Sequence, residues 1–195
     1  MFLYQEGNLC TSIYVSDFSY VRAMHMLSKK INAHLILPAY QNSMETDLMA
    51  MPLGAGYIAS YAIQEFGKDL KINIHVDPEE LLSCIRSEPA DIIGISVFSW
   101  TRNIAIWIAK RIKQINPNCI IVVGGPCVDS LEQTQRELFE EFKGNADIFV
   151  PGEGEAALSN IFWRFQNASL IEFFEAPIDG CVFMRNGIIV SGKRM

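Results

Sequence analysis

The chain has 195 residues, of which 50% are hydrophobic and 19% are charged, and its formal net charge at pH 7 is −6. This length and composition predict one globular domain with a core of its own rather than a disordered chain. The acidic balance argues against a nucleic-acid partner, and no apolar run reaches the roughly 18–20 residues that a membrane-spanning helix needs.

Residues 1–32 are the least informative part of the chain, and we interpret them as an N-terminal extension with a helix pattern over residues 17–31. The first core strand is predicted at residues 33–38, where an apolar run ends in proline. A polar loop, residues 41–47, follows this strand, and long loops at a sheet edge are often functional. The next helix, residues 54–66, opens with two glycines, which indicate close packing or the close approach of a ligand.

The middle of the chain alternates strand patterns with helix patterns. Residues 71–76 alternate apolar and polar side chains, which predicts a strand at an edge of the sheet, and Asp77 with Pro78 predicts the start of a helix. The apolar run at residues 91–98 predicts a buried strand. Thr101 is expected to cap the next helix, whose inward face consists of isoleucines at helical spacing: Ile104, Ile108, Ile112 and Ile115.

The apolar run at residues 119–123 is the clearest strand of the chain, and it ends at Gly124-Gly125-Pro126. A continuous apolar run without alternation is typical of a parallel sheet that helices cover on both faces. Ligands of such sheets bind beyond the carboxyl ends of the strands, where glycine lets a ligand approach the backbone. Taken alone, the two glycines are equally compatible with a tight strand-to-helix turn.

The last part of the chain predicts a further helix–strand–helix unit and a hairpin. Residues 130–133, Ser-Leu-Glu-Gln, predict a capping box for a helix that runs to about residue 142. A strand at residues 147–150 and a turn at residues 151–155 precede a helix with this buried set: Ala157, Leu158, Ile161, Phe162 and Phe165. Asn186-Gly187, between two apolar runs, predicts a tight β-hairpin.

Strand–helix units therefore repeat about five times. This order predicts an α/β fold with a doubly wound, mostly parallel five-stranded sheet and a C-terminal β-hairpin at its edge. The expected division is an N-terminal extension at residues 1–32, the α/β domain at residues 33–170, and the hairpin segment at residues 171–195.

The five cysteines are far apart and follow no metal-ligand spacing: Cys10, Cys84, Cys119, Cys127 and Cys181. Their odd number and the absence of a CxxC pair argue against a disulfide framework and against a zinc or iron–sulfur site within this chain. The first ten residues also lack the basic start of a signal peptide. We therefore expect a reducing, cytoplasmic compartment.

Three loops meet at the predicted carboxyl edge of the sheet, residues 96–101, 124–127 and 151–155, with the loop before Gly54 beside them. They carry hydroxyls, backbone N–H groups and an aromatic ring but few ionisable groups, which favours a large, partly apolar ligand over acid–base catalysis. We therefore assign no catalytic residue and no protein metal ligand. A dinucleotide fingerprint needs a third glycine that residues 152–154 lack, and no P-loop occurs.

Several residues near this edge also have simpler interpretations. Ser96 and Ser99 are compatible with end-of-strand turns, and Trp100 is compatible with a core or rim aromatic. The histidines fall in helix or strand patterns, where we expect structural or exposed imidazoles rather than ligands: His25, His34 and His75.

Four motifs in register resemble the N-terminal cobalamin-binding domain of radical S-adenosylmethionine enzymes. They are PLGAGYIA at residues 52–59, DIIGISV at 91–97, IVVGGP at 121–126 and PGEGE at 151–155. Their order and spacing match those of the family, and the resemblance covers about residues 33–190. The resemblance implies that cobalamin is the cofactor and that its nucleotide tail lies between the sheet and the helices.

The resemblance also implies a set of cofactor-binding residues. In chain order they are Pro52, Leu53, Gly54, Ser96, Val97, Ser99, Trp100, Gly124, Gly125, Pro126, Gly152, Glu153 and Gly154. Residues 96, 97 and 99 would line the tail pocket, and the Gly-Gly-Pro turn would let the tail pass close to the strand end. Residues 152–154 would border the corrin ring, while residues 38–54 and Trp100 would approach its lower face.

Two features depart from related cobalamin proteins. The Asp-x-His-x-x-Gly motif of methionine-synthase-like domains is absent, so the cobalt is expected to have no histidine ligand from the protein. The cysteine triad that would hold a 4Fe-4S cluster beside S-adenosylmethionine is also missing. We therefore expect a fragment or a stand-alone module that serves a radical domain in cis or in trans, for methyl transfer or related radical chemistry, and that is not catalytic alone.

Other interpretations of the same motifs stay open. The chain is also compatible with a degenerate, non-enzymatic scaffold whose pocket is empty, or with a flavodoxin-like domain for another cofactor such as a flavin. A receiver-type signalling domain is disfavoured, because its phosphorylated aspartate would follow a strand, whereas the first strand here ends in Leu37-Pro38.

Overall fold

The computed structural model describes residues 29–38 and 51–194. In chain order its elements are β1 (Ile31–Ile36), α2 (Leu53–Phe66), the 3-10 helix η1 (Gly67–Asp69), β2 (Leu70–His75), α3 (Pro78–Ser87), β3 (Ile92–Ser96), α4 (Arg102–Ile115), β4 (Ile120–Gly124), α5 (Glu132–Phe142), β5 (Ile148–Phe149), α6 (Gly154–Asn167), α7 (Leu170–Phe173), β6 (Val182–Arg185) and β7 (Ile188–Ser191). Two sequence predictions lie outside the described residues. They are the loop at residues 41–47 and the helix pattern at residues 17–31, except for the last three residues of that pattern.

The strands form one seven-stranded sheet in the order β2-β1-β3-β4-β5-β6-β7. The five strands from β2 to β5 in this order pair in parallel with their neighbours. Strands β6 and β7 continue the same sheet with antiparallel pairing. The predicted doubly wound, mostly parallel α/β fold with a C-terminal hairpin is therefore confirmed. The prediction that residues 71–76 form an edge strand is also confirmed, because β2 lies at one end of the sheet.

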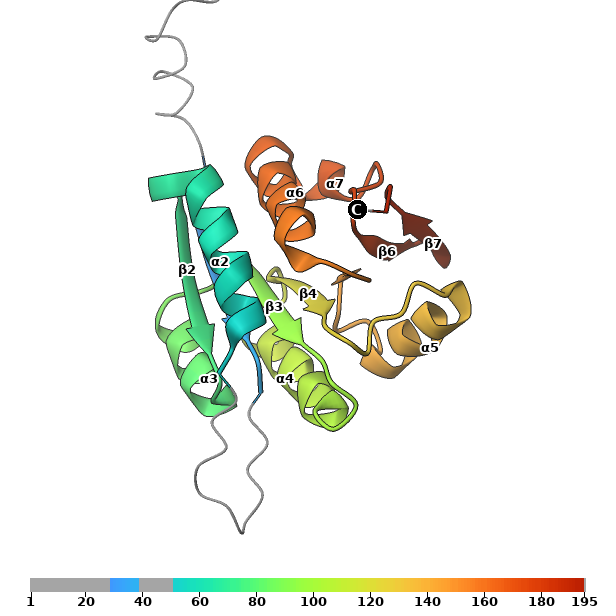
Figure 1. Cartoon of the computed structure of the whole chain (residues 1–195), viewed down its shortest axis with the longest axis horizontal. Helices are drawn as coiled ribbons and strands as arrows, with labels where there is room; N and C mark the ends of the chain where they lie inside the picture. The colour runs from blue at the N-terminus through green and yellow to red at the C-terminus, as the bar shows by residue number, and fades with distance from the viewer. Residues whose placement is uncertain (1–28, 39–50, 195) are drawn as a thin grey trace, which may run out of the picture.

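Helices cover both faces of the sheet, which explains the unbroken apolar strands (Figure 1). The helices α2 and α6 lie side by side on one face, and α3, α4 and α5 cover the other. Successive residues of β4 enter opposite layers: Ile120 and Val122 pack under α2 and α6, whereas Ile121 and Val123 pack under α3, α4 and α5. A strand buried on both faces has no position for a polar side chain.

The helix starts agree only in part with the sequence predictions. Asp77 caps α3 as expected, with its Oδ1 accepting a hydrogen bond from the backbone N–H of Glu79 at 2.9 Å. Thr101 precedes α4, but its hydroxyl accepts a hydrogen bond from the backbone N–H of Phe98, at 3.0 Å, instead of capping the helix. Within the described residues, no helix is both long and apolar enough to cross a bilayer.

The predicted capping box at residues 130–133 is wrong. Helix α5 begins after Leu131 without a side-chain cap, and the Asp129 carboxylate accepts the backbone N–H groups of Ser130 and Leu131 in the turn that precedes the helix. A capping box instead begins α7, where the side chains of Ser169 and Glu172 each accept the other's backbone N–H. The four residues of α7 are too few to show a helical apolar period, so the sequence analysis missed this helix.

The C-terminal hairpin forms as predicted. Asn186 and Gly187 have φ angles of 51° and 77°, as a type I′ turn requires. Strand β6 then pairs with β5, so the hairpin extends the sheet beyond its parallel part.

Candidate functional site

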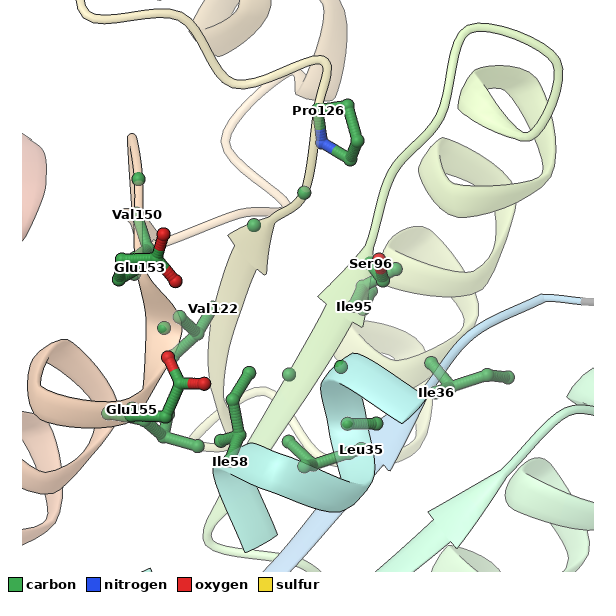
Figure 2. A pocket seen from close by; sticks show the side chains of 18 of the residues that line it. Leu35, Ile36, Ile58, Ile95, Ser96, Val122, Pro126, Val150, Glu153 and Glu155 are labelled. Carbon is green, nitrogen blue, oxygen red and sulfur yellow. The ribbon is translucent and has the colours of Figure 1, made fainter. Parts of the chain in front are cut away.

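A cavity of about 280 Å³ lies at the carboxyl edge of the sheet, between the strand ends and the first turns of α2 and α6 (Figure 2). Side chains from β1, β4, α2 and the segment after β5 make its walls apolar, among them Leu35, Val122, Ile58 and Val150. Backbone at the ends of β3 and β4 and at the start of α6 completes the lining. Open α/β sheets bind ligands at this edge.

Most of the sequence-predicted residues come together around this cavity. Those that line it are Gly54, Ser96, Gly124, Gly125, Pro126, Gly152, Glu153 and Gly154. The others that the sequence analysis named lie outside its lining: Pro52, Leu53, Val97, Ser99 and Trp100.

The residues outside the lining differ in position. Val97 is fully buried on the opposite face of the sheet, among the side chains under α3, α4 and α5. Trp100 is 64% exposed and stacks on Phe98 with 4.9 Å between ring centroids, and Phe98 itself lines the cavity. Leu53 is 60% exposed at the start of α2. Trp100 therefore reaches the cavity only through Phe98.

Sequence reasoning did not include other lining residues in the cofactor-binding set, among them Leu35, Gly94 and Ile58, together with Phe98 and Glu155 from the loops that it placed at this edge. Leu35, Gly94 and Val122 are neighbours in the register of β1, β3 and β4, so they form one row across the sheet. A Cβ at Gly94 would lie 2.7 Å from Leu35 Cδ2. The glycine inside an otherwise apolar strand was the signal that could have revealed this close approach.

Two glycines of the site have different physical reasons. Gly125 has a φ of 102°, and a Cβ there would lie 2.8 Å from the backbone N of Val97. The turn after β4 therefore needs glycine for its own packing against the end of β3, whatever ligand is present. A Cβ at Gly54, by contrast, would meet no atom within 4 Å. Gly54 therefore leaves open space at the cavity wall.

The polar side chains of the lining are the hydroxyl of Ser96 and the carboxylates of Glu153 and Glu155. Within the described residues, the lining contains no Lys, Arg or His, and no three His, Cys, Asp or Glu side chains are grouped to hold a metal ion. The arrangement suits binding of a largely apolar group rather than proton transfer.

Two buried histidines lie elsewhere, in a second cavity of about 350 Å³ between β1, β2 and α3. His34 Nδ1 lies 2.8 Å from His75 Nε2 in a stacked pair. Burial of His34, followed by the nearby His75 and Lys71, lowers the pKa of His34 from 6.5 to about 4. Neither imidazole lines the cavity at the carboxyl edge, and His25 lies outside the described residues.

The model of the B12 binding domain family matches residues 45–162 of the chain. The chain belongs to the B12-binding domain family. The predicted cofactor, cobalamin, is therefore confirmed, and so is the resemblance that led to it.

Known proteins that resemble this B12-binding domain include a methyltransferase and a radical enzyme. An uncharacterized methyltransferase of Pyrococcus horikoshii, PH0819, is 30% identical over 134 residues, which are 65% of this chain and 28% of that protein. The cobalamin-dependent S-adenosylmethionine radical enzyme OxsB with aqua-cobalamin bound superposes with a TM-score of 0.65 at 18% identity, over 90% of this chain and 24% of OxsB. Apo OxsB gives a TM-score of 0.60, also at 18% identity, over 85% of this chain and 22% of that one. The OxsB likeness concerns the fold, and the chain spans about a quarter of the length of these proteins.

The cavity is compatible with part of cobalamin. Its volume of about 280 Å³ lies just below the roughly 300–1,000 Å³ of sites that enclose a whole drug-sized ligand. It therefore suits the nucleotide tail with its aromatic base, and the larger corrin ring would have to lie outside it. The apolar walls and the open space at Gly54 match an aromatic base, and the polar side chains of the lining are those of Ser96, Glu153 and Glu155.

Proposed function

We propose that this chain holds cobalamin for a radical S-adenosylmethionine methyltransferase, with a radical domain acting in cis or in trans. The observation that carries the proposal is an apolar cavity at the carboxyl edge of a B12-binding domain, sized for the tail of the cofactor. The names of the relatives, a methyltransferase and a cobalamin-dependent radical enzyme, support the reaction class. When bound, cobalamin supplies the methyl-carrying chemistry.

The residues of the chain would bind and orient the cofactor. The walls around Leu35, Ile58 and Val122 would enclose the tail and exclude water, and the Ser96 hydroxyl would make a hydrogen bond inside the cavity. The exposed Leu53 and Trp100 stand beside the cavity rather than in its lining, which favours contact with the larger ring over contact with the tail.

We further propose that no histidine of the protein binds the cobalt. His34 and His75 are packed against each other in the second cavity, away from the carboxyl-edge cavity. The electron paramagnetic resonance spectrum of the bound cofactor, reduced to Co(II), should therefore lack the splitting that an axial nitrogen causes. A nitrogen triplet that disappears in a His25→Ala variant would contradict this.

The four described cysteines are free, which supports action in a reducing, cytoplasmic compartment. Among the described residues, no three His, Cys, Asp or Glu side chains are grouped to hold a metal ion. The same cysteines offer no cluster ligands to a radical reaction. The chain would therefore depend on its partner domain for catalysis.

The test of the proposed site is a pair of glycine substitutions in α2. A leucine at Gly54 would project into open space at the cavity wall, whereas a leucine at Gly56, where a Cβ also meets no atom within 4 Å, lies outside the lining. If the bound tail fills that space, the leucine overpacks it at a cost of about 1–3 kcal/mol, so Gly54→Leu should weaken hydroxocobalamin binding about 10- to 100-fold. Gly56→Leu should bind as the unchanged protein does.

Cobinamide, which lacks the nucleotide tail, separates the cavity from the rest of the site. Its affinity should be weaker than that of hydroxocobalamin and should be the same in the Gly54→Leu and Gly56→Leu variants. The proposal fails if the unchanged chain does not retain hydroxocobalamin through gel filtration. The tail assignment fails if Gly54→Leu binds hydroxocobalamin as tightly as Gly56→Leu does.

A further inference from the structure

The inner end of the carboxyl-edge cavity, away from the strand ends, has an apolar floor and apolar covering side chains. Leu35, Gly94 and Val122 are register neighbours on β1, β3 and β4, and all three line the cavity. Ile58 of α2 and Leu158 of α6 line it from the helix side. Figure 2 shows Ile58, Leu35 and Val122 around the same space. A group that enters this end therefore meets hydrocarbon from the sheet and from both helices.

The lining of the cavity can accept hydrogen bonds more readily than it can donate them. Its polar side chains are those of Ser96, Glu153 and Glu155, and the two carboxylates only accept. The Ser96 hydroxyl lies two residues beyond Gly94 along β3, and so about 6.6 Å nearer the carboxyl edge than the floor. The backbone N–H groups of the floor point along the sheet, because β1, β3 and β4 each have a paired strand on both sides. The floor itself therefore offers no donor.

This pattern distinguishes between the bases that the tail of a cobamide can carry. In cobalamin the base is 5,6-dimethylbenzimidazole, whose six-membered ring carries two methyl groups and no nitrogen. An adenine base has two ring nitrogens in that ring, both hydrogen-bond acceptors, and an exocyclic amine. A carboxylate of the lining can accept from the amine, but the ring nitrogens would be buried on a floor that donates nothing.

We propose that the inner end of the cavity selects cobamides with a methylated benzimidazole base, as in cobalamin, over cobamides with a purine base. The inference rests on the proposed function, because it requires the nucleotide tail in this cavity. A purine loses the contacts that the two methyl groups make with the apolar floor, and it leaves at least one ring nitrogen without a donor. The floor of the sheet thus decides which member of the cofactor class binds.

Absorbance titration of the chain with three cobamides in their hydroxo forms tests the inference. They carry dimethylbenzimidazole, unsubstituted benzimidazole and adenine. Unsubstituted benzimidazole lacks the two methyl groups but adds no polar atom, so its cobamide should bind about tenfold more weakly than hydroxocobalamin. The adenine cobamide should bind at least about tenfold more weakly than the benzimidazole cobamide, which is the loss expected for one unsatisfied acceptor.

Two neighbouring valines of β4 provide a matched pair of variants. Val122 lines the cavity, whereas Val123 is buried on the opposite face of the sheet, under α3, α4 and α5. Threonine keeps the shape of valine and replaces one methyl group with a hydroxyl that can donate to a ring nitrogen. Val122→Thr should therefore reduce the tenfold difference between the benzimidazole and adenine cobamides to about threefold or less, and Val123→Thr should keep it. Circular dichroism of each variant reports whether its fold is intact.

The possible outcomes separate this inference from the proposed function. Equal affinities of the unchanged protein for the benzimidazole and adenine cobamides overturn the selection of the base and leave the proposed function standing. This comparison decides the inference even where a variant does not fold. The same ratio in folded Val122→Thr and Val123→Thr also overturns it, because the floor would then have no part in the selection. No retention of hydroxocobalamin by the unchanged protein overturns the proposed function itself.

Discussion

Acidification should destabilise the folded protein through His34. Its side chain is only 3% exposed between β1, β2 and α3, and burial is the main cause that lowers its pKa from 6.5 to about 4. His75 and Lys71 act in the same direction, and Glu88 acts against them. The folded state therefore binds fewer protons at His34 than the unfolded state does between about pH 6.5 and pH 4.

The sign and the size of the effect follow from this difference. The stabilisation is complete above the unfolded pKa of 6.5 and is lost as the pH falls toward the folded pKa of about 4. A difference of this size corresponds to about 3 kcal/mol in all, of which about 2 kcal/mol is lost by about pH 5.

Urea denaturation at several pH values between about 8 and 5 measures the effect, with His34→Asn as the comparison. An asparagine amide retains a group that can bond to His75 Nε2 but does not titrate. The free energy of unfolding of the unchanged protein should fall by about 2 kcal/mol more than that of His34→Asn over this range. Parallel profiles for the two proteins, with equal denaturant slopes, would refute the reasoning.

Three further substitutions test local interactions in the protein. Gly125→Ala should reduce the free energy of unfolding by about 2–4 kcal/mol, because Gly125 has a φ of 102° and a Cβ there would lie 2.8 Å from Val97 N. The control is Gly124→Ala, whose Cβ would meet only Val150, at 3.9 Å, and which should cost under about 1 kcal/mol. Urea titration of both variants measures the difference, and equal losses would contradict this prediction. Ser96→Ala should weaken hydroxocobalamin binding about five- to tenfold, measured by absorbance titration. The control is Ser60→Ala, which changes an exposed serine of α2 outside the cavity lining. Equal affinities of the two variants would show that the Ser96 hydroxyl makes no hydrogen bond to the cofactor. Ser159→Ala should raise the thermal midpoint, since the buried Ser159 Oγ has no hydrogen-bond partner among the described residues, and a lower midpoint would mean that this hydroxyl is satisfied.

Much of the site's location could be predicted because strand ends have their own composition. Apolar runs that stop after Phe98, at Gly124-Gly125-Pro126 and before Gly152 identify the carboxyl edge without any tertiary information. These predicted positions do converge on one cavity. The glycines could not be interpreted further, because a glycine that packs against backbone, such as Gly125, and one that leaves space, such as Gly54, look the same in a sequence.

The sequence by itself determined the order of strands and helices along the chain, the double burial of the central strands and the position of the carboxyl edge of the sheet, because each of these depends on local runs and periods of apolar residues. Only the tertiary structure decided which side chains line the cavity at that edge. Side chains alternate along a strand, so Val97 turns away from the cavity while its neighbour Ser96 lines it. Ile58 and Glu155 join the cavity because α2 and α6, far apart in the chain, pack side by side on one face of the sheet.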